Sequence, residues 1–238
     1  ATMQAGAGGT SLAIAVFVHQ MLRKKGWKLS FGFGGSTKYM VDMLEEGQMG
    51  YILDAQAFDL DSVKSIEKNL NHIPYPVFNA YNYHSKGNLT TMMDIMILGA
   101  TEIDTGFNGN VVTHSDGLLL HGIGGWQNCL HARNVILPVP LFRDRIPVIV
   151  DRVTTLCGPG ELIDVIITER GIAINPRRQD LIEAVRGKGL PLVTIEELKE
   201  TAERICGKPE KAAFDDKVVA AIKWVDGTVI DAVRKVRK

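Results

Sequence analysis

The chain has 238 residues, enough for one large α/β domain or for a domain with a small appendage. Hydrophobic residues make up 45% of it and charged residues 23%, and its 27 basic side chains equal its 27 acidic ones in number. This balance gives no overall field toward nucleic acid, and the apolar runs are shorter than the ~18–20 residues of a membrane span, so we expect neither nucleic acid nor membrane as a partner.

The first third of the chain alternates strands, glycine-rich turns and helices. A turn at residues 6–9 precedes apolar residues at helical spacing, and the basic run 23–25 with Gly26 predicts the end of that helix. Residues 27–33 then predict a strand, and a second glycine turn ending at residue 37 opens a helix to residue 47. A strand at 51–53 and a helix at 59–70 follow. This alternation is typical of parallel strands covered by helices.

The rest of the chain is predicted to be richer in strands. Residues 72–90 predict a loop, and the apolar run 94–99 predicts a buried strand. Thr194 and Glu197 have capping-box spacing ahead of a helix that ends at 206–207, and Asp226 with Gly227 predicts the turn of a C-terminal hairpin. We therefore expect one α/β domain. Further strands are predicted at 111–113, 118–120, 134–139, 147–153 and 162–168, and a further helix at 176–185.

Three glycine clusters are suited to anions. Main-chain N–H groups at a strand-to-helix turn, together with the helix dipole, attract phosphate, carboxylate or an oxyanion. The clusters at 6–9 and 32–35 match neither the P-loop nor the dinucleotide fingerprint, and both are equally compatible with plain tight turns. In the third cluster, three glycines within residues 122–125 indicate the close approach of a ligand or of a neighbouring strand.

The sequence does not assign a single role to the other polar residues. The Asn/Asp-rich segment 102–110 follows a buried strand, where α/β folds place chemistry, but Asx turns would also explain it. Arg170 and Arg177 suit carboxylates, although clustered arginines more often form surface ion pairs. The six histidines and three cysteines lack the spacing of a metal site or a disulfide framework, so we expect no metal and a cytoplasmic location.

Several stretches resemble the citrate lyase α-subunit (citrate CoA-transferase) family: residues 6–13, 53–59, 94–105, 145–155, 159–161, 168–178 and 226–231. The resemblance extends over nearly the whole chain and corresponds to the C-terminal half of a family member. We therefore expect residues 1–238 to form a single CoA-transferase-like domain of a longer two-domain chain. The resemblance implies an open, mostly parallel sheet with helices on both faces, plus the C-terminal β-hairpin.

The resemblance also implies a reaction. Citrate and an acetyl-carrier thioester would give a citryl-carrier thioester and acetate. The co-substrate would be CoA or a phosphopantetheine-type acyl carrier thioester, with no cofactor bound covalently to this chain. The expected partners are the acyl carrier protein (γ-subunit), the lyase (β-subunit) and the chain's own N-terminal domain, within an oligomer. Without that domain we expect the isolated chain to be inactive.

Residue roles follow from the same resemblance. Gly124 and Gly125 match a Gly–Gly loop beside the thioester and are expected to hold the oxyanion, a role in which one lost donor costs about 2.7–4 kcal/mol. Asn108 is expected to join them as a catalytic residue. The expected substrate-binding residues are Gly8, Gly9, Asn110, Arg170 and Arg177, together with Gly34 and Gly35, which are expected from the glycine cluster at 32–35 and not from the resemblance.

Two departures bear on mechanism and substrate. Classical CoA-transferases carry a catalytic glutamate ahead of the strand at 94–99, but residues 71–91 contain neither Glu nor Asp. This favours direct attack by the citrate carboxylate, through a mixed anhydride. Trp126, Gln127 and Asn128 stand where the family has His and an acidic residue, so Trp126 either lines a different carboxylate pocket or covers the core.

Two other functions remain open at this point. One is a CoA-transferase that acts on free CoA thioesters of a different small acid, which a thioester-exchange assay would separate from carrier-dependent transfer. The other is a non-enzymatic sugar-phosphate-sensing domain of the same broad fold, which would bind sugar phosphates and be inert in thioester exchange.

Overall fold

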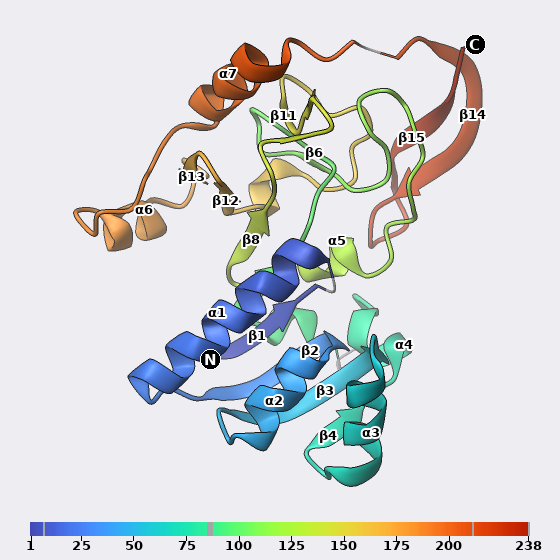
Figure 1. The fold of residues 1–238 in the computed structure, drawn as a ribbon. Coiled ribbons are helices and arrows are strands. Elements are labelled where there is room, and N and C mark those ends of the chain that lie inside the picture. Colours follow the sequence, from blue (N-terminus) through green and yellow to red (C-terminus); the bar gives the residue numbers. More distant parts are fainter. Residues whose placement is uncertain (7, 85–87, 211, 238) are drawn as a thin grey trace. The chain divides into compact units, whose positions relative to one another are not determined.

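The computed structural model of the chain describes residues 1–6, 8–84, 88–210 and 212–237 (Figure 1). Their contacts divide them into two compact units. Unit 1 is formed from residues 1–99 and 131–135, and unit 2 from residues 100–130 and 136–238. The expectation of a single domain over residues 1–238 stays a prediction, because two such units can belong to one domain or to two.

Unit 1 is built on parallel strands in the order β5-β1-β2-β3-β4. Parallel neighbours require crossover connections, and helices α1, α2 and α3 supply them between β1 and β4. The strands are β1 (Thr2–Ala5), β2 (Leu29–Ser36), β3 (Met49–Ala57), β4 (His72–Pro74) and β5 (Ile95–Ile97). The helices are α1 (Gly9–Lys25), α2 (Lys38–Glu45), α3 (Leu60–Lys68) and α4 (Val77–Tyr81), with a 3-10 turn η1 (Thr90–Met92).

Local sequence signals set the ends of these helices. Helix α1 ends as predicted at Gly26, whose φ of 65° suits glycine and whose N–H donates to the Arg23 carbonyl. Helix α3 begins after Asp59, whose carboxylate accepts the Ser62 N–H. The helices and strands enclose a methionine-rich core that includes Met3, Met40, Met43 and Met49, where the flexible thioethers fill irregular gaps.

Two predictions for unit 1 were wrong. Residues 32–35 do not form a turn but lie within β2, because their missing Cβ atoms admit close neighbours. A Cβ at Gly32 would lie 2.5 Å from Met40 Cε, and one at Gly35 would lie 1.7 Å from the Phe58 ring. The predicted loop 72–90 contains β4 and α4. Buried His72 ties β4 to the sheet, with its Nε2 3.2 Å from Asp54 Oδ2.

Unit 2 contains several small groups of strands (Figure 1). Strand β12 pairs in parallel with β8 and antiparallel with β13, β6 lies between β11 and β7, β9 pairs with β10, and β14 with β15. These strands are β6 (Glu102–Asp104), β7 (Gly109–Asn110), β8 (Val135–Pro138), β9 (Phe142–Arg143), β10 (Ile146–Pro147), β11 (Ile149–Val150), β12 (Val165–Thr168), β13 (Gly171–Ile174), β14 (Phe214–Lys223) and β15 (Val229–Val236). The helices are α5 (Trp126–Cys129), α6 (Gln179–Val185) and α7 (Ile195–Cys206), with a 3-10 turn η2 (Gly160–Leu162).

The predicted fold class is confirmed as a mixed α/β arrangement, with mostly parallel strands in its main sheet and a C-terminal antiparallel hairpin. The capping box of α7 forms between Thr194 and Glu197, and Gly227 turns the hairpin with a φ of 91°. No helix among the described residues combines the length and the apolar character needed to cross a membrane.

Two predicted strands of unit 2 are absent. The Asn110 side-chain oxygen accepts the N–H groups of Val112 and Thr113, which removes them from any strand ladder at 111–113. Residues 118–120 form only an isolated bridge between Thr113 and Leu119. Their three leucines are exposed, so the burial that stabilises an apolar strand is missing.

Candidate functional site

The glycine bend at residues 122–125 is open to solvent. Gly122 and Gly124 are exposed, and a Cβ at either would meet nothing within 4 Å. Gly124 has a φ of 58°, the left-handed region that favours glycine. The N–H groups of Gly124 and Gly125 donate to no acceptor within the described residues. Two adjacent main-chain donors are therefore available to an oxygen atom that approaches the bend.

Trp126 anchors this bend to the rest of unit 2. Its side chain is 7% exposed, and its ring fills the space beside Gly109 and Gly158. A Cβ would lie 2.7 Å from the ring at Gly109 and 2.5 Å from it at Gly158. Of the two roles left open for Trp126, the structure shows that it covers the core. The next residue, Gln127, donates from Nε2 to the Cys157 carbonyl at 2.8 Å.

The loop between β6 and β7 is held by its own side chains. The Asp104 carboxylate accepts the N–H groups of Gly106 and Asn108 and the Asn108 side-chain amide. The Asn108 oxygen accepts the Gly160 N–H at 2.9 Å, which links the loop to η2. Asn108 is half-buried, and its hydrogen bonds to Asp104 and Gly160 show that it holds the loop in shape. Its catalytic role stays a prediction.

Asn110 and Glu102 form a buried polar cluster behind this loop. Asn110 is fully buried and donates from Nδ2 to Glu102 Oε2 at 2.7 Å and to the Thr113 carbonyl. Glu102 also accepts from the Ser115 hydroxyl and from the N–H and hydroxyl of Thr154. The Asn110 amide is thus committed to internal partners, and its predicted contact with substrate remains untested.

The two predicted arginines lie at opposite ends of the β12–β13 hairpin. Arg170 is exposed in its turn, whereas Arg177 lies three residues beyond Ile174, the last residue of β13. The four paired positions of the hairpin are separated by three rises of ~3.4 Å, so its two ends lie about 10 Å apart. Arg177, whose side chain is 69% exposed, has Nη1 3.6 Å from Glu161 Oε2 in η2, the turn that also binds Asn108. The structure therefore brings Arg177, but not Arg170, toward the β6–β7 loop.

Arg178 is a structural residue beside Arg177. Its guanidinium lies 2.7 Å from Asp164 and 2.8 Å from Asp180. The hydrogen bond that Arg178 donates to Asp180 raises the pKa of Arg178, and the same bond lowers the pKa of Asp180 to about 2. Among the described residues, the Arg177 guanidinium has one carboxylate within 4 Å, at 3.6 Å, whereas that of Arg178 has two at 2.7 and 2.8 Å. Of the two arginines, Arg177 is therefore the more available to a substrate carboxylate.

The remaining predicted residues belong to unit 1. Gly8 and Gly9 are exposed at the start of α1, and Gly8 precedes its first turn without a side-chain cap. Gly34 and Gly35 are buried within β2, where Gln4 and Phe58 cover them. Close packing therefore explains Gly34 and Gly35 without a ligand, and the open main chain at Gly8 and Gly9 stays compatible with one.

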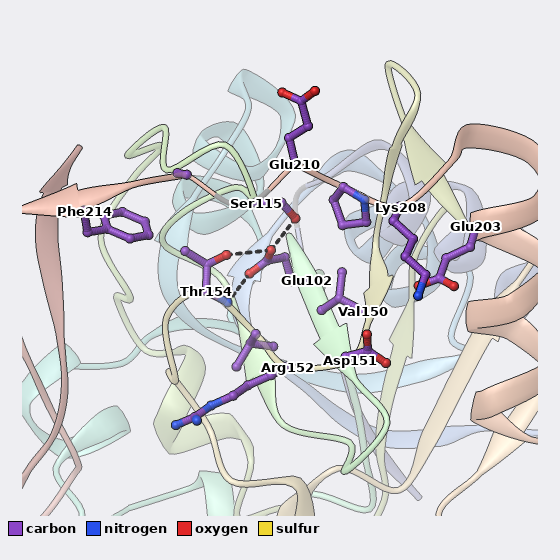
Figure 2. Close-up of a pocket in the computed structure, with 13 residues that line it drawn as sticks. Glu102, Ser115, Val150, Asp151, Arg152, Thr154, Glu203, Lys208, Glu210 and Phe214 are labelled. Carbon is purple, nitrogen blue, oxygen red and sulfur yellow. Dashed lines mark hydrogen bonds between the residues drawn. The ribbon is translucent and has the colours of Figure 1, made fainter. Parts of the chain in front are cut away.

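Unit 2 also contains a cavity of about 280 Å³ that the sequence did not reveal (Figure 2). Ser115 and Thr154 point toward the buried Glu102 carboxylate, whereas the Arg152 side chain extends away from it. Lys208 and Phe214, from the chain on either side of residue 211, also line the cavity. Because its lining residues are distant in sequence, only the folded structure shows that they surround one space.

Two of the three cysteines are inert by their environment. Burial raises the pKa of the Cys129 thiol to about 12 and that of the Cys157 thiol to about 11. Such thiols remain protonated near neutral pH and are poor nucleophiles. In the part of the chain that the structure describes, no group of three His, Cys, Asp or Glu side chains is placed to hold a metal ion.

Comparison with known proteins gives matches over the whole chain. A family model described as "Citrate lyase, alpha subunit (CitF)" matches residues 1–236. The citrate lyase alpha chain of Klebsiella pneumoniae is 42% identical over 237 residues, which cover 99% of this chain and 47% of that protein. The corresponding protein of Escherichia coli is 40% identical over 238 residues, with 100% and 47% covered. The chain thus spans about half the length of these curated relatives.

Solved structures agree with these matches. A Streptococcus mutans structure described as the putative alpha subunit of citrate lyase in complex with citrate is similar at a TM-score of 0.97 and 43% identity, covering 100% of this chain and 47% of that one. RipA from Yersinia pestis has a TM-score of 0.62 at 15% identity, covering 86% of this chain and 49% of its own. That distant likeness shows the fold alone.

Proposed function

The chain belongs to the citrate lyase α-subunit family, and on that premise we propose that it forms part of a transferase that exchanges acetyl for citryl on an acyl carrier thioester. The exposed bend at 122–125, with two uncommitted N–H groups in a chain that matches the family from end to end, is the observation that carries the proposal. The citrate named for the Streptococcus mutans structure supports citrate as the acid.

The proposed reaction balances without a group on the enzyme. A citrate carboxylate oxygen attacks the acetyl thioester carbonyl, and the carrier thiolate leaves, so that a mixed anhydride of acetate and citrate forms. The thiolate then attacks the citryl carbonyl of this anhydride, and acetate leaves with the bridging oxygen. No net proton is taken up, so the step depends mainly on holding the reactants in attack geometry, a contribution of up to about 7–11 kcal/mol.

Negative charge develops on the carbonyl oxygen in both halves of this reaction. Main-chain N–H groups that are already oriented stabilise such an oxyanion without reorganisation. We assign this role to Gly124 and Gly125. Arg177 and Asn108 both contact η2, Arg177 through Glu161 and Asn108 through Gly160. In this proposal the Arg177 guanidinium attracts a second carboxylate of citrate. Arg170, Asn110 and the glycines of unit 1 keep their predicted roles as proposals only.

Two observations fit a route without a covalent glutamyl intermediate. Residues 71–91 contain no acidic residue. Glu102, which lines the cavity of unit 2, has both oxygens occupied by donors from Asn110, Ser115 and Thr154. A carboxylate with so many donors is a weak nucleophile, because attack would sacrifice several charge-assisted hydrogen bonds.

The N–H of Gly125 provides the test. In the full-length protein, Gly125→Pro deletes this donor at a backbone φ of −83°, near the range that proline accepts, whereas Gly125→Ala adds a side chain and keeps the donor. We expect the proline variant to lose roughly 10²–10³-fold in kcat for acetate release from acetyl-carrier and citrate, and the alanine variant to lose far less. Equal losses in the two variants, or none, would contradict the assignment.

A further inference from the structure

The glycine bend at 122–125 leads into a helix that is too short to fix the bend by itself. Helix α5, labelled in Figure 1, has four residues, and a single helical turn is unfavourable without further contacts. The bend closes through a main-chain hydrogen bond from the Trp126 N–H to the Ile123 carbonyl at 3.2 Å. The direction of the N–H groups in the bend therefore depends on what holds the first residues of α5.

Trp126 holds α5 against two glycines that leave no room for a side chain. Gly109 and Gly158 are joined by main-chain hydrogen bonds in both directions, at 2.9 and 3.1 Å. A Cβ atom at Gly109 would lie 2.7 Å from Trp126 Cη2, and one at Gly158 would lie 2.5 Å from Trp126 Cζ3. Carbon atoms in contact are normally about 3.5–4.0 Å apart. The space that receives the indole ring therefore exists only while both positions are glycine.

Gln127 attaches α5 to the same pair of segments. Its side chain is buried and donates from Nε2 to the Cys157 carbonyl at 2.8 Å. The Cys157 N–H in turn donates to the Gly109 carbonyl at 2.9 Å. The ring of Trp126 and the amide of Gln127 thus fix the start of α5 to one main-chain assembly.

This assembly belongs to the elements that carry Asn108 and η2. Gly109 begins β7, directly after Asn108. Gly158 precedes η2, whose first residue, Gly160, donates its N–H to Asn108 Oδ1 at 2.9 Å. A shift of the Trp126 ring would therefore move the bend relative to the β6–β7 loop and to η2.

We propose that Trp126 is a positioning residue whose ring, seated against Gly109 and Gly158, directs the Gly124 and Gly125 N–H groups toward the reacting acyl oxygen. The inference rests on the proposed function, because it adds a residue that holds the donors assigned there. A misplacement of about 1 Å can lower a rate roughly 10²-fold. The fit of a buried ring can therefore set kcat without contact between the ring and the reactants.

A double-mutant cycle with Gly125→Pro tests this role in the full-length protein. Trp126→Phe removes the ring atoms that reach the two glycines. We expect kcat for acetate release to fall roughly 10–10²-fold, with the KM values for acetyl-carrier and citrate nearly unchanged. In the Gly125→Pro background the same substitution should cost clearly less, because one of the donors that Trp126 positions is already absent.

The matched control is Ile163→Val. Ile163 is fully buried, and its Cδ1 lies 3.1 Å from the position of a Gly109 Cβ, so this variant also opens space beside Gly109. Ile163 is not part of α5. We therefore expect Ile163→Val to leave kcat nearly unchanged.

Gly109→Ala separates positioning from a loss of folding. Alone, its methyl group would meet the indole ring and displace it. Combined with Trp126→Phe, the methyl group would occupy the space that the shorter ring vacates, and such volume-conserving changes are tolerated best. We expect each single variant to be slow and the pair to recover most of the lost kcat.

Three results would overturn the role of Trp126: the same loss for Trp126→Phe in both backgrounds, a loss no larger than that of Ile163→Val, or a pair no faster than its single variants. The proposed function fails separately. If Gly125→Pro is as active as Gly125→Ala, the donor is not used and the positioning role falls with it. If Gly125→Pro is slow and Trp126→Phe is not, the oxyanion assignment stands and only the role of Trp126 is overturned.

Discussion

Glu102 is a buried acidic residue that forms several hydrogen bonds and, within the part of the chain that the structure describes, no ion pair. It is 1% exposed and accepts from Asn110, Ser115 and Thr154. Asn110 and Ser115 follow Glu102 by 8 and 13 residues, whereas Thr154 is 52 residues away in the sequence. The carboxylate therefore connects the β6–β7 region to the wall of the cavity in Figure 2.

Removing the Glu102 charge should destabilise the protein. Glu102→Gln keeps the shape, but its amide presents an N–H₂ group to donors that need an acceptor. We expect a loss of roughly 1.5–3 kcal/mol in the free energy of unfolding, the usual worth of hydrogen bonds to a charged group. Urea titration measures it, with Glu210→Gln at the exposed rim of the same cavity as control, for which we expect a change within about 0.5 kcal/mol. Equal stability of the two variants would show that the buried hydrogen bonds contribute nothing.

The three cysteines should differ in reactivity. The pKa of Cys129 is raised to about 12 and that of Cys157 to about 11, both by burial, so the thiolate fraction of each is lower than normal at every pH below those values. Each pKa unit of this shift lowers the thiolate concentration about tenfold. We therefore expect iodoacetamide at pH 8 to modify Cys206 first, as followed by peptide mass spectrometry. In urea all three should react alike; rapid labelling of Cys129 in the folded protein would contradict its burial.

At the scale of elements, α7 shows how a local signal fixes a helix within unit 2. The Thr194 hydroxyl accepts the Glu197 N–H at 3.1 Å, and the Glu197 carboxylate accepts the Thr194 N–H at 2.7 Å. The buried face of the helix includes Ile195, Leu198 and Ala202. The cap therefore positions the first turn from which this apolar face is presented to unit 2.

Loss of the cap should be measurable. Thr194→Ala removes the acceptor for the Glu197 N–H, and we expect it to cost about 1 kcal/mol of stability, within a range of roughly 0.5–2 kcal/mol. The control is Glu200→Ala, an exposed position later in the same helix, where alanine's helix propensity limits any loss. Chemical denaturation monitored by far-UV circular dichroism would reveal the difference. A cap variant as stable as the control would show that tertiary packing alone holds α7.

The elements that the sequence predicted well are those with signals within a few residues. Gly26 ends α1, Thr194 and Glu197 start α7, and Asp226 with Gly227 turns the hairpin. The failures depend on contacts made only in the folded chain. The Asn110 side chain accepts the N–H groups that a strand at 111–113 would need. The Phe58 ring packs against Gly35 in the space that a Cβ would fill, so this glycine serves close packing within a strand and not a turn.

The candidate site divides in the same way. The three glycines within residues 122–125 predicted a turn whose N–H groups could meet a ligand. The resemblance predicted that Gly124 and Gly125 hold the oxyanion. Spacing in the sequence could not show that Arg170 and Arg177 lie at opposite ends of a hairpin, because the pairing of β12 with β13 decides it. Nor could it reveal the cavity beside Glu102, whose lining residues lie between positions 102 and 214.

At the scale of the whole molecule, the predicted site residues are distributed over both compact units, and the chain spans about half the length of its curated relatives. The reaction proposed above is therefore one for a longer protein, to which this chain would contribute part of the site. Three features of this chain support the proposal: the uncommitted main-chain donors at Gly124 and Gly125, the exposed Arg177 beside η2, and the absence of an acidic residue from 71–91.

The central claim, direct attack by citrate with no acyl group on the enzyme, is tested by the fate of the citrate oxygens in a single turnover. The full-length protein would be mixed in excess with acetyl-carrier and with citrate labelled with ¹⁸O in its carboxylates, and the released acetate analysed by mass spectrometry. The mixed-anhydride route predicts one ¹⁸O atom in that first acetate, because acetate leaves with the bridging oxygen of citrate. Unlabelled acetate released in step with citryl-carrier formation would mean that an enzyme carboxylate took the acetyl group, and would contradict direct attack by citrate.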